Sequence, residues 1–112
     1  MNIQLFGTKK CFDTQKTERY FKERTIKYQF IDLTIKGLSK GELKSVKTSV
    51  GLNNLINTKS KDYKKLNLDQ IRGEETKEDI LLKNPQLFNT PIVRNGKEAT
   101  VGYVPEIWTT WE

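Results

Sequence analysis

The single cysteine of this 112-residue chain, Cys11, is the side chain best suited to nucleophilic chemistry. It ends the loop Gly7-Thr8-Lys9-Lys10-Cys11, which follows an apolar run at residues 3–6 and precedes an amphipathic helical stretch. Backbone N–H groups and the helix dipole favour negative charge at the start of a helix, and Lys9 and Lys10 add positive charge. Each effect lowers the pKa of a thiol, and the thiolate is the attacking species. We therefore predict a reactive cysteine, with a buried structural cysteine as the alternative.

The rest of the composition restricts how this thiol can work. The chain has no histidine, which removes Cys–His and Ser–His pairs and most zinc sites, so we expect no metal and no bound cofactor. Thr14 can donate a hydrogen bond to the thiolate or act as a plain N-cap. Asp13 would raise the pKa of the thiol unless its carboxylate points to solvent.

Charge and hydropathy exclude other classes of function. Lysine and arginine number 20 against 14 aspartate and glutamate, a net charge of +6, but acidic residues interrupt the basic stretches. The densest group, residues 59–65, has only Tyr63 as an aromatic neighbour, so we expect a solvated lysine-rich surface and no direct nucleic-acid binding. Weak attraction to acidic partners stays open. No run approaches about 18 apolar residues and no signal peptide is evident, so we expect no membrane association and a cytoplasmic protein.

Periodicity and capping signals predict the elements that position Cys11. They indicate strands at 3–6 and 28–33, a helix from a cap at Asp13 or Thr14 to about Arg24, and a C-terminal helix opening at Pro105. Pro91 to Arg94 and residues 98–102 form a hairpin around the turn Asn95-Gly96. The middle is helical: a capping box from Ser39 to Glu42 begins a helix that stops near Gly51, short pieces follow at 53–56, 61–65 and 69–71, and Thr76 begins a helix over 77–83. The order β-α-β, helical middle, β-β-α predicts one α/β domain over residues 1–112.

Five segments in order resemble the ArsC family, meaning arsenate reductase and its Spx and YffB-type relatives. They are Leu5 to Cys11, Gly51 to Ser60, Tyr63 to Leu66, Asn84 to Val93, and Val101 to Tyr103. The resemblance implies a thioredoxin-like (glutaredoxin-like) fold: a mixed four-stranded sheet with flanking helices and a helical insertion at about 38–89. It also implies that Pro91 is a cis-proline lying against the cysteine, where the alternative is an ordinary trans proline at a strand start.

The departures from the family pattern concern oxyanion binding. Family arsenate reductases hold the oxyanion with three arginines, and the matching positions here carry Asn53, Thr90 and Tyr103. Arg94 and Lys59 are near enough in the motifs to supply some charge. The resemblance therefore implies thiol chemistry without arsenate reduction. The candidate substrate-binding residues are Lys9, Asn53, Thr90, Pro91, Arg94 and Tyr103.

These observations predict a monothiol oxidoreductase in which Cys11, Thr14 and Lys10 form the catalytic set. Spx-type members often carry a Cys-x-x-Cys motif, and Thr14 stands here in place of its second cysteine. Because the chain has no other cysteine, an external thiol such as glutathione or a thiol protein must resolve the mixed disulfide. An alternative from another class is an Spx-like regulator that binds RNA polymerase through the region of Gly51, without catalysis; Tyr103 is also Spx-like. A third is a fold remnant with an inert thiol.

Overall fold

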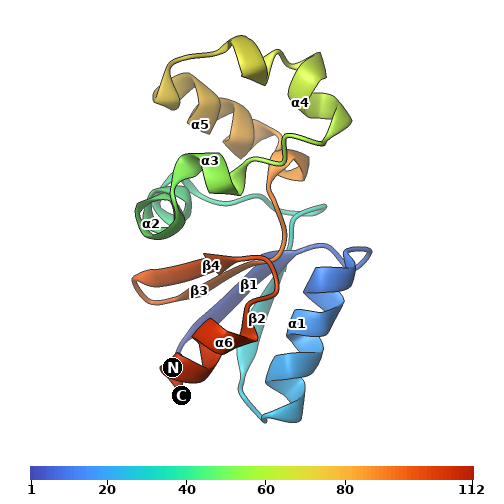
Figure 1. Ribbon diagram of the computed structural model, residues 1–112, viewed down its shortest axis with the longest axis vertical. Coiled ribbons are helices and arrows are strands. Elements are labelled where there is room, and N and C mark those ends of the chain that lie inside the picture. Colours follow the sequence, from blue (N-terminus) through green and yellow to red (C-terminus); the bar gives the residue numbers. More distant parts are fainter.

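A four-stranded mixed sheet forms the centre of the computed structural model, which describes all 112 residues (Figure 1). The strand order is β2-β1-β3-β4, with β1 parallel to β2 and the other two pairings antiparallel. This is the predicted thioredoxin-like sheet. The strands are β1 (Ile3–Gly7), β2 (Tyr28–Asp32), β3 (Ile92–Asn95) and β4 (Glu98–Val101).

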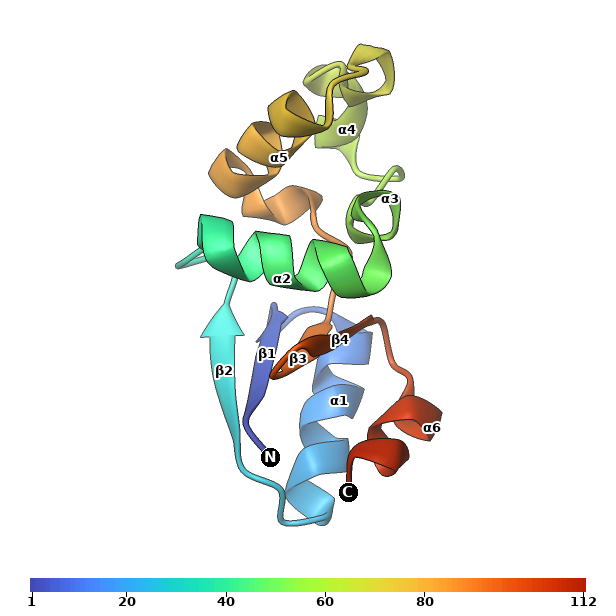
Figure 2. The same ribbon diagram turned by 90° about the vertical axis from the view of Figure 1, so that its left-hand side faces the viewer.

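Helices cover both faces of the sheet (Figure 2). One face carries α1 (Phe12–Glu23), which connects β1 to β2, and α6 (Pro105–Trp108). The other face carries the helices between β2 and β3, which extend the molecule to 43 Å along its longest axis. These are α2 (Lys40–Val50), α3 (Leu52–Leu55), α4 (Lys61–Lys65) and α5 (Glu74–Lys83), with 3-10 turns at Leu68–Gln70 and Pro85–Leu87; a third 3-10 turn, Thr109–Trp111, follows α6.

Side-chain alternation along β1 divides the core between the two faces, because successive residues of a strand point to opposite sides. Leu5 packs with Phe21 of α1 and Trp108 of α6. Phe6 belongs to the larger cluster on the other face, with Val46 of α2 and Leu81 of α5. The sheet is therefore buried on both sides. This packing fixes the C-terminal end of β1, where the Cys11 loop begins.

The predicted capping signals around α2 are confirmed. Ser39 and Glu42 form the reciprocal capping box, and Gly51 ends the helix with a φ of +86°, a conformation that glycine adopts without strain. Of the two C-terminal tryptophans, Trp108 is buried, and its indole N–H donates to Thr100 Oγ1 at 2.8 Å.

Several predicted boundaries are shifted by one to three residues, and three of these shifts have a clear physical reason. Helix α1 begins at Phe12 with Cys11 as its N-cap, so neither Asp13 nor Thr14 caps it. Helix α5 begins at Glu74, because Gly73 is its N-cap and two glutamates in the first turn suit the helix dipole. The hairpin turn is Gly96-Lys97, since Asn95 still pairs with Glu98. None of the helices is both long enough and apolar enough to span a membrane.

Candidate active site

Cys11 lies where the chain turns from the end of β1 into α1. Its backbone N–H donates to the carbonyl of Thr8 at 3.2 Å, which closes the loop. The side-chain amide of Gln15 donates to the carbonyl of Lys9 at 2.7 Å and fastens the loop to the first turn of the helix. As the N-cap, Cys11 has extended backbone angles, with φ at −78° and ψ at 122°. The half-buried thiol is thereby placed at the positive end of α1.

The segment before β3 lies against the sulfur. The Thr90 hydroxyl donates to Cys11 Sγ at 3.2 Å, and the Sγ–H donates to the Thr90 carbonyl at 3.8 Å. The peptide bond between Thr90 and Pro91 is cis, as the family resemblance implies. Residues 79 positions apart in the sequence thus meet at one sulfur.

Thr14 forms the floor of the site. Its side chain is fully buried and packs on Gly7, where a Cβ would lie only 2.6 Å from Thr14 Oγ1. A glycine at the end of β1 is therefore needed for the threonine to fit. Thr14 Oγ1 has no hydrogen-bond partner while the sulfur is a thiol. It lies near enough to Cys11 to favour the thiolate, so we interpret it as a donor that is satisfied when the sulfur ionises.

Opposing effects set the pKa of the Cys11 thiol. Burial raises the pKa, whereas the hydroxyls of Thr14 and Thr90 and the backbone N–H groups of Thr14 and Asp13 lower it. The second set prevails, and the pKa lies below its usual value. The site can therefore supply a thiolate at a lower pH than a free cysteine can.

The two lysines of the loop do not have the role expected of them. Lys9 and Lys10 are both exposed, and the pKa of Cys11 is lowered by hydroxyls and N–H groups rather than by ammonium groups. Lys9 instead lies near Asp32 at the end of β2, where its charge helps to lower the pKa of that carboxyl, after the larger effect of the hydrogen bonds from Thr34. Flexible lysine side chains in water are weak sources of local potential, which accounts for the difference.

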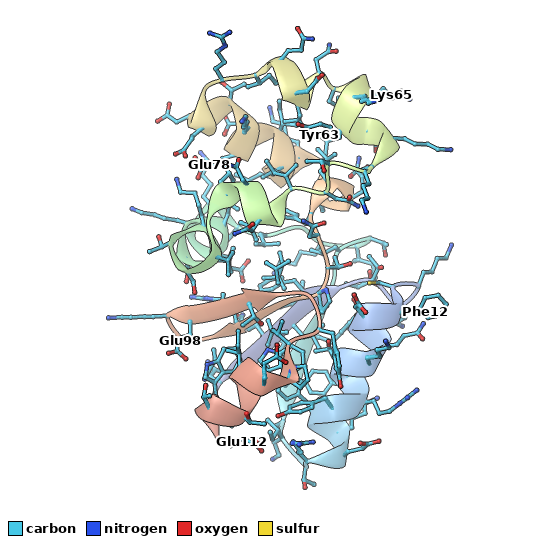
Figure 3. All side chains as sticks on the ribbon, viewed as in Figure 1. Phe12, Tyr63, Lys65, Glu78, Glu98 and Glu112 are labelled. Carbon is cyan, nitrogen blue, oxygen red and sulfur yellow. The ribbon has the colours of Figure 1, made fainter.

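Two of the predicted substrate-binding residues do not reach the sulfur. Asn53, on α3, lines a cavity within the helical part of the molecule together with Lys77 and Tyr63, of which Tyr63 is labelled in Figure 3. Arg94 lies on the α2 side of the sheet, where it donates to Ser45 Oγ at 3.1 Å and Gln4 Oε1 at 2.7 Å. Val93 packs on the α1 side of the sheet, and successive residues of a strand point to opposite sides, so the Arg94 guanidinium lies on the face opposite α1. These arrangements correct both assignments.

Tyr103 lies beside the site. The N–H of Gly102 donates to the carbonyl of Pro91 at 2.8 Å, which places the next residue next to the cis-proline segment. The Tyr103 ring is 39% exposed, contacts the Trp108 ring at a centroid distance of 5.6 Å, and lies 5.8 Å from Lys16 Nζ of α1.

Sequence reasoning missed two residues that position the site. Asn89 donates from its side-chain amide to the carbonyls of Asn54 and Ile56 and so anchors the segment that carries Thr90. Its place directly before the Thr-Pro pair was the available signal. Gln15 gave no signal, because an exposed glutamine in a first helical turn is ordinary. No three His, Cys, Asp or Glu side chains converge in an arrangement that could hold a metal ion.

The cysteine at the start of the first helix contacts the residue before a cis-proline, and the sheet has the strand order β2-β1-β3-β4. These features define a thiol protein of thioredoxin-like fold. The sequence profile of the ArsC family matches residues 6–111. The chain belongs to the ArsC family.

Relatives agree with this assignment, and solved structures agree with the fold. The chain is 30% identical to the global transcriptional regulator Spx 2 of Oceanobacillus iheyensis over 107 residues, which cover 92% of this chain and 78% of that protein. It is also 30% identical to Spx of Listeria innocua, with 90% and 79% covered. An ArsC-related protein of Bacteroides fragilis superimposes with a TM-score of 0.87 at 26% identity, covering 100% of this chain and 98% of that one. An arsenate reductase of Vibrio cholerae gives a TM-score of 0.88 at 24% identity, covering 98% and 97%.

Proposed function

We propose that this protein is a monothiol oxidoreductase of the cytoplasm in which Cys11 exchanges disulfides. The observation that carries the proposal is the hydrogen bond from the Thr90 hydroxyl to a half-buried sulfur at the start of α1, whose pKa the hydroxyls of Thr14 and Thr90 and the first-turn N–H groups lower. Such donors stabilise the thiolate, which is the attacking species.

The reaction conserves electrons at each step. The Cys11 thiolate attacks one sulfur of a substrate disulfide, forming a new S–S bond while the old one breaks, and the leaving sulfur departs with the bonding electron pair and takes a proton from solvent. Because the chain has no second cysteine, an external thiol such as glutathione or a thiol protein attacks the mixed disulfide and restores the Cys11 thiolate. The backbone around Thr90 and Pro91 positions the partner, and no oxyanion-binding arginine is required.

The test is to incubate the protein with oxidised glutathione and identify the adduct by mass spectrometry. We expect one glutathione on Cys11, its release by reduced glutathione, and no adduct with Cys11→Ser. Unfolding the chain in urea provides the control. If the unfolded chain forms the adduct and the folded chain does not, the sulfur is shielded and the proposal is wrong.

A second candidate function is favoured by the relatives named global transcriptional regulator Spx. We propose as this alternative that the chain binds RNA polymerase through the exposed junction of α2 and α3 at Gly51. Purified polymerase would then bind the wild type and Cys11→Ser equally, and Asn53→Arg, at an exposed position beside Gly51, would lose binding. Failure of the wild type to bind would exclude the alternative while leaving thiol exchange untouched.

A further inference from the structure

A cationic cleft runs along α1 and reaches Tyr103, which lies beside the site. Its volume is about 340 Å³, and it lies between α1 and the segment that joins β4 to α6. The residues that line it are Lys16, Arg19, Tyr20, Glu23, Arg24, Tyr103 and Pro105. Three cations thus face one carboxylate along this cleft.

Two of these cations have no acidic partner. Arg24 pairs with Glu112 at 3.7 Å and lies 4.1 Å from the Tyr20 ring, so its charge is used within the fold. Lys16 and Arg19 are exposed and form no ion pair; Lys16 contacts only the face of the Tyr103 ring. Their positive charge is available to a ligand.

The two free cations share one face of α1 with Phe12, the residue after the cysteine. Phe12, Lys16 and Arg19 follow the i, i+4, i+7 spacing that aligns side chains along one side of a helix. Phe12 is 78% exposed immediately after Cys11, at the N-terminal end of α1 (Figure 3). Phe12 and the two free cations therefore form one continuous stripe, which begins at the residue after Cys11.

We propose, on the basis of the thiol exchange proposed above, that this stripe selects protein disulfides whose cysteine lies in an acidic segment. Lys16 is five residues from Cys11, about 7.5 Å along the helix axis, and Arg19 is eight residues away, about 12 Å. An extended peptide advances about 3.3 Å per residue, so carboxylates two and four residues from the reacting cysteine reach the two cations. Phe12 covers the apolar part of the same segment.

The chemistry of selection is electrostatic and precedes bond exchange. Carboxylates of the substrate pair with the Lys16 ammonium and the Arg19 guanidinium, which raises the local concentration of the disulfide at Cys11. The thiolate then attacks the substrate sulfur, and the other sulfur leaves with the electron pair. No additional oxidant or reductant is needed.

The test uses three blocked peptides, each with one cysteine activated as a pyridyl disulfide. Glutamate, glutamine or lysine occupies the positions two and four residues from the cysteine on both sides. Attack by Cys11 releases pyridine-2-thione, whose absorbance gives the rate. At low salt we expect the glutamate peptide to react about tenfold faster than the glutamine peptide, and high salt to abolish the difference.

Matched variants locate the effect. Lys16→Glu combined with Arg19→Glu should remove the preference for the glutamate peptide and leave the rate with the glutamine peptide within about twofold of the wild type. Lys83→Glu combined with Lys97→Glu changes the net charge equally at exposed positions on α5 and the hairpin turn, and should keep the preference. Equal rates for all three peptides, or equal loss in both double variants, would overturn the inference. Failure of the glutamine peptide to react at all would instead contradict the proposed thiol exchange.

Discussion

At the sulfur of Cys11, the Thr90 hydroxyl is the donor whose contribution can be isolated. It donates at 3.2 Å, and valine preserves the β-branched shape while removing the donor. We expect Thr90→Val to raise the pKa of the thiol and to slow its alkylation at neutral pH several-fold, because the thiolate loses a hydrogen bond. The measurement is the rate of alkylation against pH. Thr48→Val, on the exposed side of α2, is the control, and an unchanged midpoint in Thr90→Val would contradict the prediction.

We expect the buried hydroxyl of Thr14 to destabilise the fold while it stabilises the Cys11 thiolate. Its buried hydroxyl is unpartnered while the sulfur is protonated, and an unsatisfied buried polar group destabilises a fold by about 1–3 kcal/mol. We expect Thr14→Val to raise the free energy of unfolding by about 1 kcal/mol below the pKa of the thiol and to slow disulfide exchange. Denaturant unfolding at acidic pH and the exchange rate at neutral pH are the two measurements. A less stable variant would show that the hydroxyl has a structural partner.

The residues at the sulfur were predictable to different degrees. Cys11 was identified because the cysteine stands at a strand–helix junction. Thr90 was named only as a substrate-binding residue before a family proline, and its hydrogen bond to the sulfur was not predicted. Arg94 was misassigned because its strand parity, which turns it toward Ser45 and Gln4, is a property of the sheet rather than of the motif.

Among the elements, the edge strand β4 is attached to α2 through the side chain of one serine. Ser49 Oγ accepts from the N–H of Ala99 at 2.9 Å and donates to its carbonyl at 3.2 Å, which satisfies both backbone groups on the open side of the sheet edge. An edge strand with free backbone groups is a site for unwanted pairing between chains. The contact therefore fastens α2 to the sheet and blocks this edge.

Removing that contact should be measurable. We expect Ser49→Ala to lower the free energy of unfolding by about 1–2 kcal/mol, because one side chain satisfies two backbone groups. Thr48→Ala is the neighbouring control, since its hydroxyl donates only to the carbonyl of Lys44 within the helix. Denaturant unfolding monitored by circular dichroism compares the two. Equal effects would mean that helix propensity, rather than the link to Ala99, accounts for the change.

Element type was easier to predict than element ends. The alternation of Tyr28 to Asp32 and the turn residues of the hairpin indicated strands correctly. The start of α1 was misplaced because Thr14 resembles a cap in sequence, whereas its packing against Gly7 draws it inside the helix. That contact between strand and helix is tertiary, and the helix propensity and capping preference of single residues cannot predict it.

At the scale of the whole molecule, the helical part between β2 and β3 shares a core with the sheet. The larger cluster joins Phe6 and Ile92 of the sheet to Leu43 of α2 and Leu81 of α5. Ion pairs from Lys47 to glutamates of α5 reinforce the contact between the two helices. Helical periodicity alone would also suit a separate bundle, so the prediction of one domain rested on the order of elements, in which strands flank the helical middle on both sides; the family resemblance added the insertion at about 38–89.

A shared core predicts that the two ends of the molecule unfold together. Leu81 of α5 is fully buried on one face of the sheet, whereas Trp108 is buried on the other face, where Trp111, the second fluorescent tryptophan, packs against the same cluster. We expect Leu81→Ala to lower the free energy of unfolding by about 2–5 kcal/mol and to shift tryptophan emission and helical circular dichroism to the same lower midpoint. Leu66→Ala, at an exposed position after α4, should leave both midpoints nearly unchanged. A midpoint that falls for circular dichroism but stays for tryptophan emission would mean that the helical part unfolds by itself, and residues 1–112 would then form two cooperative units.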